Sequence, residues 1–99
     1  MMELVWLKEA VDDLQEIGHT IAADDPAAAY RVLTKIETSA NSLEHHPELG
    51  RTGRVPKTRE LIIPSLPYIL SYSIKKQHIR ILAVMHTSRK WPDTFTNLQ

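Results

Sequence analysis

Two short segments of the 99-residue chain carry the side chains best suited to chemistry. Residues 50–61, GRTGRVPKTREL, contain four bases, one acid and two of the three glycines. The bases of this loop are Arg51, Arg54, Lys57 and Arg59. Residues 85–92, MHTSRKWP, add His86, Arg89 and Trp91. A guanidinium group can bind two phosphate oxygens at once, and histidine titrates near neutrality. This set of side chains could therefore bind and cleave a phosphodiester.

The chemistry that this set favours is RNA cleavage, in which a 2′-hydroxyl attacks its own phosphate and the leaving oxygen takes a proton. His86 would carry the proton, while arginines would stabilise the developing charge. If Arg59 leads a strand beside the one that ends at His86, the loop arginines could converge on His86 and Arg89. Two alternatives remain open. His86 could be a structural histidine bonded to the backbone, and Arg59 and Glu60 could be edge-strand charges that discourage aggregation.

Other kinds of chemistry find little support in the sequence. The chain has no GxxxxGK[ST], GxGxxG or GxSxG motif, so neither a phosphate-binding loop nor a nucleophile elbow is predicted. It has no cysteine, and of its five histidines the adjacent His45 and His46 would point apart. We therefore expect neither a metal site nor a cofactor.

The charges divide the chain into two halves, although the formal net charge is zero. Residues 1–49 carry ten acids and three bases, whereas residues 50–99 carry nine bases and two acids. This asymmetry indicates an acidic or anionic partner for the second half; the alternative is that the two halves complement each other. No apolar run long enough to span a membrane and no signal-peptide pattern occurs. We expect one cytoplasmic domain over residues 1–99, with a loosely held tail from about residue 92.

Two amphipathic helices are predicted in the acidic half, after a short β-prone run at residues 4–6. Apolar residues spaced by three and four predict the first helix. They are Leu7, Ala10, Leu14, Ile17 and Ile21. Asp25 caps the second helix, which begins at Pro26 and runs to about His45 before Pro47 prevents continuation. Since about two residues join the helices, they should form an antiparallel hairpin.

Three strands are predicted after the basic loop, at residues 59–63, 68–74 and 79–85. The last is apolar on both faces at its centre, as a central strand should be. By strand alternation, the residues that share a face with His86 are Arg80, Leu82 and Val84. The predicted order is β-α-α-β-β-β, an α+β fold with the helix hairpin packed on one face of a twisted, largely antiparallel sheet.

In four segments the chain resembles the ParE/RelE superfamily of toxins from bacterial type II toxin–antitoxin modules. The segments are LVWLKEAVDDLQEIGHTIAADDPAAA, HPELGRTGRVPKTREL, PYILSY and ILAVMHTSRKWP. The resemblance implies the same fold and a growth-inhibiting toxin that is neutralised by a cognate antitoxin. Antitoxins of such modules are typically disordered in part and fold around the toxin. An acidic antitoxin would suit the basic half of this chain.

The resemblance leaves the mechanism open. ParE-like members poison DNA gyrase and block replication, whereas RelE-like members are endoribonucleases that cleave mRNA on the ribosome. For the ribonuclease, the candidate catalytic residues are His86, Arg89 and Arg59. We favour the ParE-like mechanism because ribosome-dependent members are usually strongly basic and this chain is neutral. Several RelE-like members also carry a C-terminal tyrosine near the site, and no tyrosine follows Tyr72 here.

The target of the toxin is expected to contact the two basic segments in either mechanism. The predicted target-binding residues are Arg51, Arg54, Lys57, Arg59, Arg89 and Trp91. The partners that follow are the cognate antitoxin and either DNA gyrase or the ribosome with its mRNA. A third hypothesis is a family member without toxicity that only binds an antitoxin-like partner and acts as a regulatory subunit.

Overall fold

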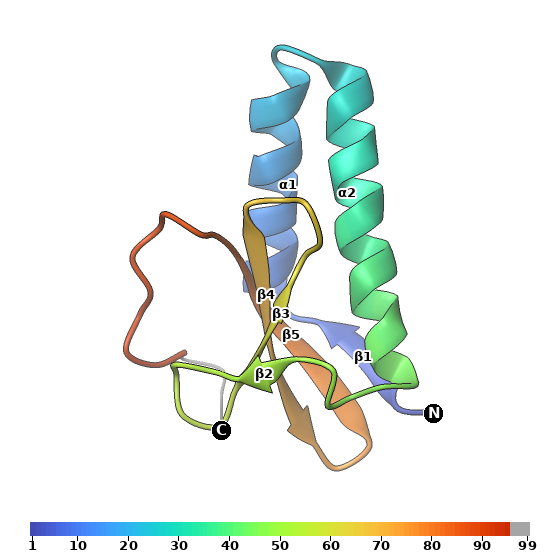
Figure 1. Ribbon diagram of the computed structural model, residues 1–99, viewed down its shortest axis with the longest axis vertical. Coiled ribbons are helices and arrows are strands. Elements are labelled where there is room, and N and C mark those ends of the chain that lie inside the picture. The colour runs from blue at the N-terminus through green and yellow to red at the C-terminus, as the bar shows by residue number, and fades with distance from the viewer. Residues whose placement is uncertain (96–99) are drawn as a thin grey trace.

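Two helices pack on one face of a five-stranded sheet in the computed structural model, which describes residues 1–95 (Figure 1). In chain order the elements are β1 Glu3–Trp6, α1 Lys8–Ala22, α2 Pro26–Asn41, the 3-10 helix η1 Ser42–Glu44, β2 Arg51–Thr52, β3 Arg59–Ile62, β4 Tyr68–Lys75 and β5 His78–His86. The predicted α+β class and element order are confirmed. The sequence pattern did not predict β2, a strand of two residues that pairs with the start of β3.

The helix hairpin forms where the sequence predicts it, but α2 ends at Asn41, before the predicted end near His45, and η1 continues to Glu44. Asp25 caps α2, since its Oδ1 accepts a hydrogen bond from the Ala28 N–H at 3.1 Å. Gly18 of α1 faces Leu33 of α2, and a Cβ at this glycine would lie 2.9 Å from the Leu33 Cδ1 atom. A glycine here therefore allows the two helices to approach closely.

The hydrophobic core lies between the helices and the sheet, and both layers contribute to it. Its fully buried members include Ala10, Ile36, Ala40, Leu43, Ile63, Leu70, Tyr72, Ile79 and Ile81. Burying an aliphatic or aromatic side chain stabilises a fold by about 1.5–3 kcal/mol. This shared core fixes α1 against β5, which positions the candidate site described below.

The sheet is mixed, because β1 joins it parallel to β5 while the other neighbours are antiparallel. The register between β4 and β5 breaks at Leu82, which has no partner on β4, whereas Ile81 and Ala83 are paired. Such a bulge shifts the alternation of side chains by one position. Arg80 therefore lies on the opposite face of the sheet from His86, and the prediction that they share a face is wrong.

The end of the chain is described only up to residue 95. The predicted loose tail from about residue 92 falls partly on residues 96–99, which lie outside the described part, and it stays a prediction. None of the helices in residues 1–95 is long and apolar enough to cross a membrane.

Candidate functional site

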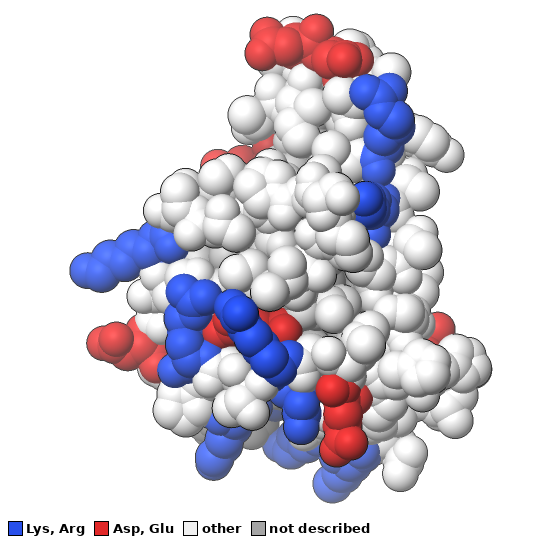
Figure 2. Space-filling model, viewed as in Figure 1, with Lys and Arg blue, Asp and Glu red and all other residues white. Residues whose placement is uncertain are grey.

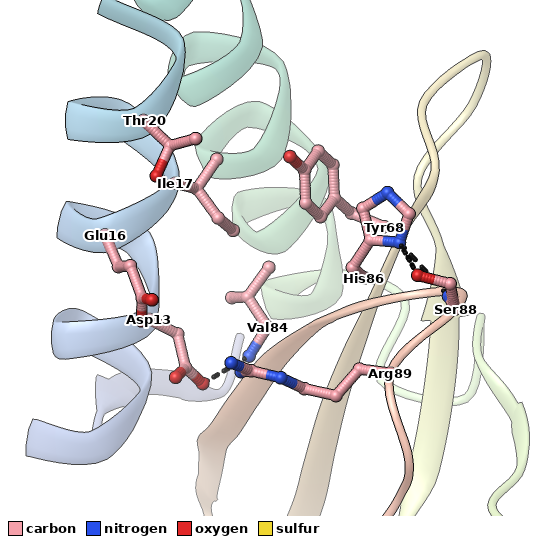
Figure 3. Close-up of a pocket in the computed structure, with 9 residues that line it drawn as sticks. All are labelled: Asp13, Glu16, Ile17, Thr20, Tyr68, Val84, His86, Ser88 and Arg89. Atoms are coloured by element: carbon pink, nitrogen blue, oxygen red, sulfur yellow. Dashed lines mark hydrogen bonds between the residues drawn. The ribbon is translucent and has the colours of Figure 1, made fainter. Parts of the chain in front are cut away.

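A pocket of about 380 Å³ opens between α1 and the end of β5 (Figure 3). Its lining residues are Asp13, Glu16, Ile17, Thr20, Tyr68, Val84, His86, Ser88 and Arg89. The helix supplies an acidic wall, and the end of β5 with the segment after it supplies a basic one. The wall formed by α1 was not anticipated from the sequence.

His86 lies at the end of β5, directly opposite Tyr68 in the strand register. The two rings meet edge to face, with centroids 5.4 Å apart and an interplanar angle of 88°. The Ser88 N–H donates to His86 Nδ1 at 3.1 Å, and the Ser88 Oγ lies 2.8 Å from the same atom. Because Nδ1 accepts a backbone bond, the proton of the neutral ring is on Nε2. The ring is both anchored to the backbone and exposed, so a ligand in the pocket can reach it.

Asp13 links the acidic wall to β5. Its Oδ2 accepts a hydrogen bond from the Val84 N–H at 3.0 Å, on an edge of β5 that β1 leaves uncovered after Ile81. Burial raises the pKa of Asp13, while the bond from Val84 and the positive charge of Arg89 oppose that rise. Figure 3 shows the Arg89 guanidinium pointing toward Asp13, and Glu16 adds a second carboxylate to the wall. An anion that approached Arg89 would therefore meet two carboxylates.

Arg51 and Arg54 are engaged with Glu60 on the face of the sheet opposite His86. Glu60 is only 2% exposed. Its Oε1 accepts from Arg51 Nη2 at 3.0 Å, and its Oε2 accepts from the Arg54 backbone N–H at 2.7 Å and from Arg54 Nε at 3.1 Å. Burial alone would raise the pKa of Glu60, but these hydrogen bonds outweigh it and hold the pKa below its usual range. The Arg54 guanidinium also stacks on the Trp91 ring, 4.1 Å from its centroid.

Arg59 holds the start of the basic loop in place. Its Nη1 donates to the Gly50 carbonyl oxygen at 2.7 Å. The Gly50 N–H donates to the Tyr72 hydroxyl at 2.9 Å, and that hydroxyl donates to the Pro47 carbonyl oxygen at 2.7 Å. A Cβ at Gly50 would lie 2.7 Å from the Tyr72 ring, so the close approach requires glycine.

For Arg59, the expected convergence on His86 is wrong. Arg59 pairs with Tyr72, while His86 pairs with Tyr68. Along the strand direction, Arg59 and His86 are therefore four residues of β4 apart, which is about 13 Å at the rise of a strand. In addition, β4 lies between β3, which carries Arg59, and β5, which carries His86. Arg59 and His86 therefore do not share one site, although Arg54 contacts Trp91, two residues beyond Arg89. The roles of these residues in catalysis or target binding remain predictions.

Three residues of the pocket were not predicted from the sequence: Asp13, Glu16 and Tyr68. Pairing of residues 68–74 with the following strand could have identified Tyr68, because a short hairpin turn fixes the register. No comparable signal marks Asp13 and Glu16, since acids on the exposed side of a helix ordinarily face solvent. Within residues 1–95 no three His, Asp or Glu side chains are grouped so that they could hold a metal ion.

Comparison with known proteins places this arrangement in a family. The model of the family described as "ParE toxin of type II toxin-antitoxin system, parDE" matches residues 4–91. The chain belongs to this family. As a ParE-family member, it is a toxin of the ParDE type.

Two relatives of this ParE-family chain cover most of its length. It is 44% identical over 87 residues to "Putative toxin Y4kP" of Sinorhizobium fredii. The aligned region covers 88% of this chain and 90% of that protein. It is 30% identical over 89 residues to "Toxin RelE2" of Caulobacter vibrioides. The aligned region covers 90% of this chain and 99% of that protein.

A solved structure extends the similarity to the fold. A chain from the "Chromosomal ParDE TA system from P. aeruginosa" matches this ParE-family chain with a TM-score of 0.79 and 27% identity. The match covers 87% of this chain and 96% of that one. The helix hairpin on a mixed sheet is therefore an arrangement that this chain shares with a ParDE protein.

Proposed function

We propose that this ParE-family toxin inhibits growth by binding DNA gyrase and blocking replication, and that it does not cleave RNA. The observation that carries the proposal is the separation of His86 from Arg59. Cleavage of a phosphodiester requires the proton carrier and the charge-stabilising arginines to surround one phosphate. Here His86 lies at the end of β5 beside Tyr68, whereas Arg59 lies beside Tyr72, four residues further along β4. The Arg59 guanidinium is also bound to a backbone carbonyl oxygen.

The surroundings of His86 also favour a protein target over RNA. Asp13 and Glu16 line the same pocket, and two carboxylates would repel a phosphate backbone that approached Arg89. The apolar side chains of Ile17, Val84 and Tyr68 line the pocket beside these charges. Aromatic side chains and arginine are enriched in protein-binding sites, and the core of such sites is apolar.

Ribonuclease activity is the second candidate, and two observations favour it. Tyr68 packs against His86 and Arg89 lines the same pocket, so a tyrosine is present beside the histidine although none follows Tyr72. One relative carries the name "Toxin RelE2". In that mechanism His86 would move the proton and Arg89 would stabilise the phosphate, without help from the loop arginines.

An antitoxin partner follows from the ParDE type, and a groove offers a place for it. The groove has a volume of about 430 Å³ beside the end of α2 and the edge of β3. Leu49 and Ile62 line it and are 56% and 52% exposed. Exposed apolar surface of this kind marks a site for a partner, so a folding segment of the antitoxin would cover these side chains.

Pulse-labelling of DNA and protein synthesis within minutes of inducing this chain alone tests the proposal. We expect DNA synthesis to fall first, with a DNA-damage response, while protein synthesis continues. A first effect on protein synthesis would instead support the ribonuclease. His86→Gln provides a further test, because the folded variant should retain most of its toxicity if gyrase is the target. If neither synthesis changes, the chain is a non-toxic antitoxin-binding subunit and the proposal is wrong.

A further inference from the structure

The basic charge of the second half gathers at one end of the sheet. The β2–β3 loop and the β4–β5 turn both lie at this end, because β2 and β4 run toward it and β3 and β5 start from it. The bases of residues 53–60 and 73–80 are Arg54, Lys57, Arg59, Lys75, Lys76 and Arg80. The only acid in these two segments is Glu60, which is buried and already bound to arginines. Figure 2 shows most Lys and Arg over this lower end, with a few acids among them, and a further group of acids at the tip of the helix hairpin.

Two lysines at this end are held by the backbone in an unusual conformation. Lys57 in the β2–β3 loop has φ 68° and Lys76 in the β4–β5 turn has φ 57°. Left-handed backbone is uncommon for residues other than glycine, and here it turns the chain between neighbouring strands. Both side chains are exposed, and within residues 1–95 neither forms an ion pair or a hydrogen bond. Their charges are therefore available to a partner.

A polar cleft of about 320 Å³ lies beside Lys57. Its lining residues are Thr52, Lys57, Thr58, Arg59, Ser73 and Ile74. Ser73 is 4% exposed and its hydroxyl has no hydrogen-bond partner in the described structure. Hydroxyl groups next to lysine and arginine form the usual set of contacts to phosphate oxygens in protein–DNA complexes.

We propose that this end of the sheet binds the phosphate backbone of duplex DNA, with one phosphate at the cleft beside Lys57 and a second beside Lys76. Among the described residues that line the cleft, Ile74 alone is apolar, whereas the centre of a protein–protein interface is rich in apolar and aromatic side chains and poor in lysine. The surface therefore fits a phosphate backbone better than an acidic protein. The choice of duplex DNA over RNA rests on the proposed function, since a gyrase poison acts where the enzyme holds DNA.

Fluorescence anisotropy of the purified full-length chain with a labelled duplex of about 20 base pairs tests this inference without gyrase. Each lysine–phosphate contact contributes about −0.9 to the slope of log K against log salt concentration. The variant Lys57→Gln/Lys76→Gln should therefore bind with a slope smaller by about 2 and at least tenfold more weakly at low salt. The variant Lys8→Gln/Arg31→Gln removes the same net charge from the helices and should bind like the native chain.

Three outcomes would overturn the inference. One is the absence of DNA binding at low salt. If the chain then binds polyglutamate, a model of an acidic protein, the surface takes acidic protein instead of DNA. Another is equal weakening by the two double variants, which would show that net charge alone matters. The third is tighter binding of single-stranded RNA of the same length. Gyrase poisoning without DNA binding would overturn this inference and leave the proposed function in place. DNA binding by a chain that does not block replication would overturn the proposed function and leave this inference in place.

Discussion

Arg89 differs from the loop arginines in what its side chain contacts. Arg51 and Arg54 bind Glu60, and Arg59 binds the Gly50 carbonyl oxygen, so these three stabilise the fold of the loop itself. The side chain of Arg89 instead lines the pocket between α1 and β5. A ligand can reach a charge of this kind without breaking a structural bond. We therefore expect substitution of Arg89 to act on function and substitution of Arg59 to act in part on stability.

Arg89→Ala should weaken toxicity about tenfold, which corresponds to about 1.4 kcal/mol of binding free energy. Its free energy of unfolding should stay within about 0.5 kcal/mol of the native value, as for most surface substitutions. Growth after graded induction measures the first effect, and urea denaturation measures the second. The neighbouring Lys90→Ala, an exposed base that does not line the pocket, is the matched control. Equal toxicity of native chain, Arg89→Ala and Lys90→Ala would show that this pocket is not the target-binding surface.

At the scale of elements, Glu60 joins two segments that have no regular structure of their own. It fixes Arg54 in the β2–β3 loop, and Arg54 in turn stacks on Trp91 of the segment after β5. A carboxylate with several hydrogen bonds from arginine is favoured in its charged form. The loop and the segment around Trp91 are therefore held against the sheet by one buried charge.

Glu60→Gln should lower the free energy of unfolding at pH 7 by about 2 kcal/mol, the usual contribution of hydrogen bonds to a charged group. The folded-state pKa of Glu60 lies below its usual range, so its stabilisation is present above the pKa of an unfolded glutamate, about 4.3, and is lost as the pH falls through the folded value. The difference between native chain and variant should thus shrink in acid. Tryptophan fluorescence should also change, because the partner of Trp91 loses its anchor. The exposed Glu48→Gln is the control, and a pH-independent difference would contradict this account.

The sequence predicts those elements whose patterns depend on local periodicity and capping. The spacing of Leu7 to Ile21 places the first helix, and the cap at Asp25 places the start of the second. The bulge at Leu82 could not be predicted, because an apolar residue in an apolar strand fits either register. That one residue decides on which side of the sheet Arg80 lies relative to His86. The burial of Glu60 among arginines was not predicted for a similar reason. An acid beside bases on a strand is equally typical of an exposed charge at the edge of a sheet.

At the scale of the whole molecule, the neutral total charge comes from two oppositely charged parts held apart. The acids of the first half lie largely on the helix hairpin, and the bases of the second half lie on the sheet and its loops (Figure 2). Lys8 pairs with Asp12 and Arg51 with Glu60, each within its own half, while Glu3 meets His78 across the halves. Arg89 also points toward Asp13, so the two halves complement each other in part (Figure 3). The two ends present opposite fields, which can orient the protein toward an anionic partner.

The two charged parts remain one cooperative unit because a single core joins them. Ile36 of α2 is fully buried against residues of the sheet, and Trp6 packs on the same core. Ile36→Ala should therefore lower the free energy of unfolding by about 2–5 kcal/mol, the cost of a large-to-small change in a core. The midpoints measured by circular dichroism of the helices and by tryptophan fluorescence should fall together, as in a two-state transition. Tyr30→Ala on the same helix, at a side chain that is 73% exposed, should change neither. Separate midpoints would mean that the hairpin unfolds independently of the sheet, and the α1 wall of the pocket would then be a mobile part of the site rather than a fixed one.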